Sequence, residues 1–157
     1  MANEEIILDP LPADEEAALF RERAPQYLLC FNEACPLSAR CMHWLVGCHA
    51  DVCQTLVYAV NPHHPSVQGG NCRHFRERLR VAMKTGLHRF YTGMTGRQER
   101  AIRTRLIEIF NRRVYYAIRN GQRLVTPDEE LTIADVCREY GWTGPLAFDS
   151  EQADYLW

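Results

Sequence analysis

The residues whose types and spacing point most directly to chemistry are the cysteines of the stretch CFNEACPLSARC. Four residues separate Cys30 from Cys35, and five separate Cys35 from Cys41. Cys72 follows after a loop rich in proline and glycine. A structural zinc site takes four thiolate or imidazole ligands, with short loops between neighbouring ligands and a distant segment supplying the rest. This spacing favours zinc, and four thiolates would also hold an iron–sulfur cluster.

The spacing leaves other readings open. Cys48 and Cys53 continue the series, and several histidines offer further ligands. Buried structural thiols are the plain alternative, because free cysteine is among the most buried residue types. A cysteine-dependent enzyme or redox sensor is another alternative, and it needs a thiolate activated by an imidazole or a helix N-terminus. No family-specific catalytic signature surrounds any of the cysteines. The histidines are His43, His49, His63, His64 and His74.

Composition narrows the classes of protein. The 157 residues are 46% hydrophobic and 24% charged, as in an ordinary globular domain. No apolar run approaches the roughly 20 residues that span a bilayer, so we expect no membrane partner. The N-terminus, MANEEIILDPLPADEEAALF, is acidic where a secretion signal would be basic. We therefore expect a cytoplasmic protein, in which seven cysteines are a poor disulfide framework.

The net charge of −2 hides a segregation along the chain. Residues 71–123 contain 14 Lys and Arg against three Glu, whereas both ends of the chain are acidic. The acidic ends would neutralise this basic middle within one compact domain, or the basic middle would face a polyanion. Nucleic acid is therefore the first partner class to test, with a protein partner as the alternative.

We expect a mainly α fold with a minor β element. Residues 1–26 form an acidic N-terminal segment with a short helix at 13–24, and 27–157 form a single globular domain. Its 27–75 part is cysteine-rich, with a cysteine cluster, and its 76–157 part is helical. The run TLVYAV at 55–60 is rich in β-branched and aromatic residues, which favours a strand.

The helical part contains the two clearest helix signals. Thr95 and Gln98 form a capping box that opens a long amphipathic helix over 95–120, ended by a glycine. A second capping box at Thr126 opens a helix over 127–140. Large aromatic residues in the last sixteen positions indicate that the C-terminal tail packs on the body.

Arginines follow one face of the helix expected at 95–120. At about 100° per residue, four of them fall in one arc. Such a stripe is typical of a solvated face with local ion pairs, and it also suits contacts with phosphates. Arg113 falls instead on the apolar face and needs a partner, for which Asp149 or Glu139 would serve in a structural ion pair. The stripe consists of Arg97, Arg105, Arg112 and Arg119.

The stretches YLLCFNEACPLSARCMHWLVG, NCRHF, RRVYYAIRNGQRLVTPDE and CREYGWTG resemble an uncharacterised family of small proteins from gut Bacteroidales, the domain-of-unknown-function 6078 family. The resemblance covers residues 27–157. It implies that four of the cysteines recur as a set, that Cys48, Cys53 and Cys137 do not, and it supplies no function. The stretch RERLRVAMKTG is richer in arginine than the family pattern. The recurring cysteines are Cys30, Cys35, Cys41 and Cys72.

Together these features predict a non-enzymatic, metal-stabilised binding module with zinc on Cys30, Cys35, Cys41 and Cys72. Four protein ligands leave no open position for a substrate, so the metal would be structural. The alternatives are an iron–sulfur cluster at the same thiols, a cysteine-dependent enzyme or redox sensor, and a protein–protein adaptor without metal.

Overall fold

The computed structural model describes residues 7–157, and the chain folds as two compact units. Unit 1 contains residues 81–154 together with Ile7, and unit 2 contains residues 8–80 and 155–157. Within the described residues no helix is long and apolar enough to cross a membrane. Five α-helices and three short antiparallel strands make up the regular structure of this part of the chain, which confirms the mainly α fold with a minor β element.

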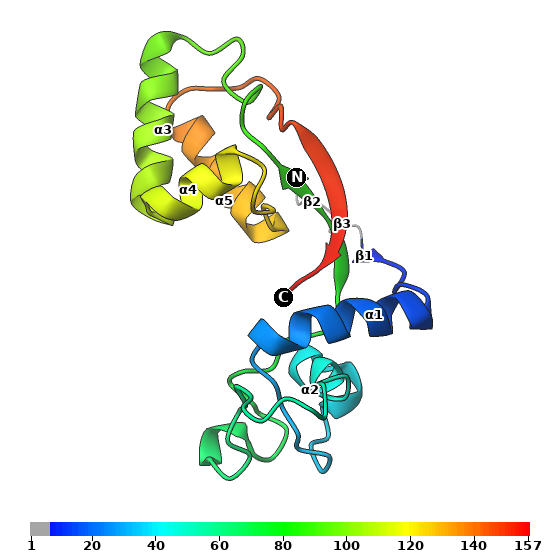
Figure 1. The fold of residues 1–157 in the computed structure, drawn as a ribbon. Coiled ribbons are helices and arrows are strands. Elements are labelled where there is room, and N and C mark those ends of the chain that lie inside the picture. Colours follow the sequence, from blue (N-terminus) through cyan, green and yellow to red (C-terminus); the bar gives the residue numbers. More distant parts are fainter. Residues whose placement is uncertain (1–6) are drawn as a thin grey trace. The chain divides into compact units, whose positions relative to one another are not determined.

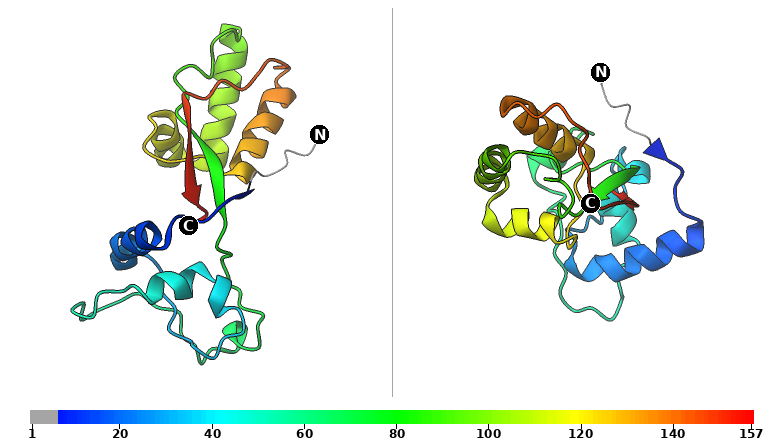
Figure 2. Two further views of the ribbon diagram at one scale, coloured as in Figure 1. Left: turned by 90° about the vertical axis from the view of Figure 1, so that its right-hand side faces the viewer. Right: turned by 90° about the horizontal axis from the view of Figure 1, so that it is seen from above.

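Unit 1 packs three helices on one side of a small sheet. The helices are α3 (Gly96–Phe110), α4 (Arg112–Arg119) and α5 (Pro127–Glu139). The sheet has the order β1 (Ile7–Leu8), β2 (Arg80–Thr85) and β3 (Ser150–Tyr155). Figure 1 and the right-hand view of Figure 2 show α3, α4 and α5 on the same side of β2 and β3.

Two of these helices, α3 and α5, begin at the capping boxes expected from the sequence. The Thr95 hydroxyl accepts from the amide of Gln98, and the Gln98 side chain accepts in return from the amide of Thr95. Thr126 and Glu129 make the same reciprocal pair at the start of α5. The helix predicted over 127–140 is confirmed as α5.

The continuous helix predicted over 95–120 is wrong. The helix is interrupted at Asn111, because a backbone with φ 61° and ψ 161° cannot continue an α-helix. The Asn111 side chain then accepts from the amide of Val114, at 3.0 Å, and so caps a new helix, α4. The apolar spacing continues across the break because both helices bury their apolar side chains in one core, including Leu106 and Ile118.

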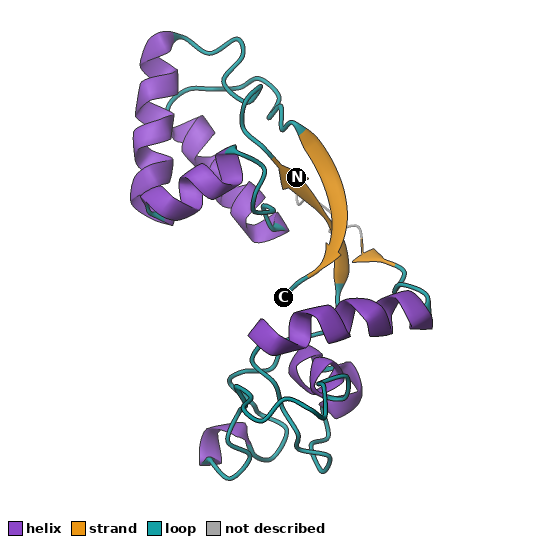
Figure 3. Ribbon diagram, in the orientation of Figure 1, coloured by secondary structure: helices purple, strands orange, loops and turns teal. Residues whose placement is uncertain are grey.

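Unit 2 contains α1 (Ala13–Arg23) and α2 (Met42–Gly47), three short 3₁₀ turns and long loops (Figure 3). Its core is built from α1, α2 and the last residues of the chain. Tyr155 is buried, and its ring lies 5.7 Å from that of Phe20 on α1. The predicted packing of the aromatic tail is confirmed. The 3₁₀ turns are Ala24–Gln26, Ser38–Arg40 and Pro65–Val67.

The strand predicted at 55–60 is also wrong. This segment makes one isolated parallel bridge, between Leu29 and Ala59, and most of its large side chains stay exposed. Leu56 is 84% exposed and Tyr58 is 81% exposed, and Val60 is the one buried residue of this run. The strand propensity of the segment is present, but no neighbouring strand pairs along its length in the described part of the chain.

Candidate metal centre

Three consecutive tight turns over residues 32–41 connect Cys35 to Cys41 and begin two residues after Cys30. The amide of Cys35 donates to the carbonyl of Asn32, that of Ser38 to Cys35, and that of Cys41 to Ser38. Each bond closes a turn over three residues, so the chain coils back on itself between one cysteine and the next. The four- and five-residue gaps therefore return each thiol toward the same side of the loop. Cys41 then becomes the residue that precedes helix α2.

Backbone hydrogen bonds attach the other segments to this loop. The amide of Cys30 donates to the carbonyl of His43 over 2.9 Å, at the start of α2. The amide of Met42 donates to the carbonyl of Arg76 over 2.8 Å, which holds the segment after Cys72 beside Cys41. Gly47 also matters, because a Cβ there would lie 2.6 Å from the carbonyl oxygen of Cys30. Only glycine lets the two segments approach this closely.

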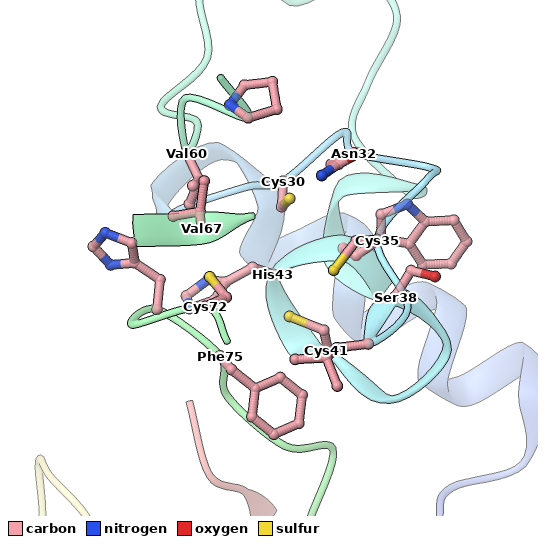
Figure 4. Close-up of a pocket in the computed structure, with 14 residues that line it drawn as sticks. Cys30, Asn32, Cys35, Ser38, Cys41, His43, Val60, Val67, Cys72 and Phe75 are labelled. Atoms are coloured by element: carbon pink, nitrogen blue, oxygen red, sulfur yellow. The ribbon is translucent and has the colours of Figure 1, made fainter. Parts of the chain in front are cut away.

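The four cysteines singled out by spacing and resemblance line one pocket of unit 2. Figure 4 shows their thiols directed toward a common space, from the loop before α2, from the start of α2 and from the segment that begins at Cys72. The cavity volume of this space is about 20 Å³. That volume has room for about one atom or one water molecule. The four thiols are those of Cys30, Cys35, Cys41 and Cys72.

The thiols also interact electrostatically. Partial burial raises the pKa of Cys30, an amide hydrogen bond at Asn32 opposes the rise, and the neighbouring thiols of Cys41, Cys35 and Cys72 add to it. The Cys30 thiol is therefore harder to ionise than an ordinary cysteine, in part because the other three thiols are close to it. An activated cysteine nucleophile has a lowered pKa, so the raised pKa of Cys30 is opposite to what that role requires.

Two histidines share the pocket lining, His43 and His74. His43 lies with its Nδ1 2.6 Å from the carbonyl of Leu28, and because a carbonyl only accepts, Nδ1 carries the proton. Burial lowers the pKa of His43, which favours the neutral ring, while hydrogen bonds with the backbone of Leu28 and His74 oppose the shift. The Tyr27 ring stacks on it at 5.0 Å. Both are among the five histidines that the sequence offers as possible ligands, and nothing in the sequence distinguishes them from the other three.

The thiols do not stand at metal-ligand distances from a common point. Among the described residues, no group of three or more His, Cys, Asp or Glu side chains is close enough to hold a metal ion. The structure therefore gathers the four cysteines around one pocket without closing them into a coordination shell. A metal-tied cysteine cluster as an element of the fold is not supported by this geometry.

The remaining cysteines lie elsewhere. Cys48 and Cys53 are exposed and do not line the thiol pocket. Burial raises the pKa of Cys48, and the Glu33 carboxylate adds to the rise. Cys137 is buried in the core of unit 1, and burial raises its pKa to about 11. It is a core thiol of α5, far from any role as a nucleophile at neutral pH.

The predicted arginine stripe is divided by the break at Asn111. Arg97 and Arg105 lie on α3, with Arg105 paired to Glu108 over 3.1 Å. Arg112 and Arg119 lie on α4, where the Arg112 guanidinium stands 5.6 Å from the ring centre of Tyr116. The four therefore do not share one helical face, and a role for them in binding nucleic acid stays a prediction.

Arg113 lies exposed in the first turn of α4. It falls off the apolar face because the new helix starts at a different rotation. None of the ion pairs found within residues 7–157 includes it, and Asp149 is bound to His88 instead. The expected ion pair of Arg113 stays a prediction.

The protein is thus defined by a mainly α fold in two units and by a thiol-lined pocket in the loop-rich unit. The model of the family of unknown function DUF6078 matches residues 13–157, and the chain belongs to this family. The match includes α1, which the resemblance seen in the sequence left out. Neither the comparison with curated proteins nor the comparison with solved structures gave a match.

Proposed function

We propose that the chain is a non-enzymatic binding module whose unit 2 is stabilised by one zinc ion on Cys30, Cys35, Cys41 and Cys72. One observation supports this proposal above the others. Thiols that are up to 42 positions apart in the sequence line a single space with room for about one atom.

A structural role suits both the ligands and the surrounding chain. Four thiolates complete a tetrahedral zinc shell and leave no position for a substrate. The segments that carry them belong to the loop-rich part of unit 2, which has few buried side chains and little regular structure. A zinc ion would fix these loops to α2, and the free energy of zinc binding would become free energy of folding.

Binding requires a local movement of the thiols. Zinc–sulfur bonds of about 2.3 Å at tetrahedral angles place the sulfurs about 3.8 Å apart. The described thiols point into one space but stand outside that geometry. Cys35 lies within the loop of tight turns, so side-chain rotations and a small shift of the loop would close the shell.

The size of the space favours a single ion. An iron–sulfur cluster also takes four thiolates, but it contains several iron and sulfide atoms. A space for about one atom suits zinc without a large expansion of the loops. Iron and acid-labile sulfide in the purified protein would instead assign the same thiols to a cluster.

Metal analysis of the purified protein tests the proposal. We expect about one zinc per chain, lost when Cys35→Ser or Cys72→Ser removes a ligand. The matched control is Cys48→Ser, because Cys48 is exposed and lies outside the pocket. Chelation should lower the thermal midpoint of the protein and of Cys48→Ser, but not that of Cys72→Ser. Protein without stoichiometric metal, or equal midpoints for all variants, would remove the zinc proposal.

Nucleic acid is the partner that we propose to test first. The exposed arginines of unit 1 support it, since Arg97, Arg100 and Arg113 have no acidic partner among the described side chains. Binding to mixed DNA and RNA should weaken steeply as salt rises, because released counterions carry the affinity. Absence of binding at low salt would favour a protein–protein adaptor.

A further inference from the structure

A second hollow of unit 2 lies beside the thiol pocket. Its cavity volume is about 300 Å³, against about 20 Å³ for the thiol pocket. Val60 and Val67, labelled in Figure 4 at the edge of the thiol pocket, also line this hollow. Both are almost fully buried, and with Leu28 they form an apolar floor.

The charged and polar side chains of this hollow are rich in hydrogen-bond donors. Asn61, His64, Ser66, Arg73 and His74 line it, and no Asp or Glu does. Arg73 is exposed, and no ion pair of the described residues includes its guanidinium. A guanidinium without a carboxylate, in a hollow without acidic residues, makes the local potential positive.

The hydrogen bonds of the loop fix the orientation of two further donors. The amide of Ser66 donates to Nδ1 of His64 at 3.2 Å, so Nδ1 is an acceptor and the neutral ring carries its proton on Nε2. The amide of His63 donates to Oδ1 of Asn61 at 3.0 Å, which leaves the Asn61 NH₂ group to donate elsewhere. Both groups can therefore donate to a ligand at neutral pH, without protonation of the histidine.

We propose that this hollow binds a phosphate monoester attached to an apolar body. Arginine binds phosphate with paired N–H groups, and donors from three side chains suit the three-dimensional set of phosphate oxygens better than a planar carboxylate. The apolar floor would cover the organic part of the ligand, as in other small-molecule sites of this size. The site does not depend on the zinc proposal, although its wall is shared with the thiol pocket.

Phenyl phosphate is the probe, and calorimetric titration of the full chain is the measurement. We expect saturable binding that weakens about tenfold or more in Arg73→Gln, since a lost charged hydrogen bond has roughly that effect. His64→Ala should also weaken it. The control is Arg138→Gln, an exposed arginine of α5 in unit 1 that lies outside every proposed site, and this variant should bind as the unchanged protein does.

Three results would overturn the site. They are no binding of phenyl phosphate by the folded chain, equal binding by Arg73→Gln, and binding of benzoate as tight as that of phenyl phosphate. Zinc content measured on the same samples distinguishes failure of the phosphate site from failure of the proposed zinc site. Arg73→Gln that retains its metal and its thermal midpoint but loses the phosphate would support the site alone.

Discussion

Gly86 and Asp149 lie so close that the carboxyl group of Asp149 fills the place where any side chain of residue 86 would start. A Cβ on Gly86 would be 2.7 Å from the Cγ of Asp149. The carboxylate accepts from the amides of His88, at 3.0 Å, and Arg89, at 2.9 Å. The turn after β2 is thus held by an acid that precedes β3, and this is possible only with glycine at residue 86.

Replacement of Gly86 with alanine should destabilise the protein by about 2 kcal/mol or more. The φ of Gly86 is 76°, which costs an L-residue about 1–2 kcal/mol, and the contact with Asp149 adds to that cost. Urea unfolding measures the change. The matched control is Gly96→Ala at the start of α3, where a Cβ meets nothing within 4 Å and stability should not fall. Equal effects of the two substitutions would contradict this account of the turn.

Asp149 should also make the protein sensitive to acid. Partial burial would by itself raise the pKa of Asp149, but the amide hydrogen bonds from Arg89 and His88 and the His88 ring lower it overall. A lowered pKa in the folded state gives stability that is complete above the unfolded value, near 3.9, and is lost as the pH falls through the folded value.

Asp149→Asn is the variant that isolates this effect. It should be less stable than the unchanged protein at pH 7, and the difference should shrink as the pH falls below about 4. Free energies of unfolding from pH 2 to pH 7 provide the test. A difference that stays constant down to pH 2 would show that the ionised form of Asp149 is not the stabilising one.

Asn111 holds a backbone conformation that is nearly restricted to glycine. With φ 61° and ψ 161° it carries strain of about 1–3 kcal/mol, partly offset by its cap on Val114. Asn111→Gly should therefore be about as stable as the unchanged protein, and Asn111→Ala should be less stable by about 1–2 kcal/mol. Thermal unfolding compares them. An Asn111→Ala protein as stable as Asn111→Gly would indicate that α3 and α4 can join into one helix.

The cap at Thr126 should contribute about 1 kcal/mol to α5. Its hydroxyl accepts from the Glu129 amide, and the Glu129 carboxylate accepts from the Thr126 amide and from Arg123, at 2.7 Å for the closest contact. Thr126→Ala removes the hydroxyl, whereas Thr126→Ser retains it. Denaturant midpoints should fall for the first variant and stay nearly unchanged for the second. The reverse order would show that packing of the threonine methyl group matters more than the cap.

Features set by a few neighbouring residues could be predicted from the sequence. Both capping boxes depend on residues three positions apart, and both are present. The break at Asn111 could not be predicted, because the apolar spacing continues on both sides of it. Strand β3 also escaped prediction, since SEQADY has no β-branched residue and is a strand through its pairing with β2.

The candidate site shows the same division. Spacing and the family resemblance selected Cys30, Cys35, Cys41 and Cys72, and these thiols line one pocket. The sequence could not give their separations, which depend on the conformation of the loops. It also gave no sign of the donor-lined hollow, because Asn61, His64 and Arg73 meet only through the folding of the loops.

Zinc coordination by the four thiolates can be measured by X-ray absorption at the zinc edge of the purified protein, because this method counts the atoms bonded to the metal. We expect four sulfur neighbours at about 2.3 Å and no nitrogen or oxygen neighbour. Cys72→Ser should lose the signal, and Cys48→Ser should retain it unchanged. A shell with two or more nitrogen or oxygen neighbours, or protein that contains no bound zinc, would contradict the assignment of Cys30, Cys35, Cys41 and Cys72 as the ligands.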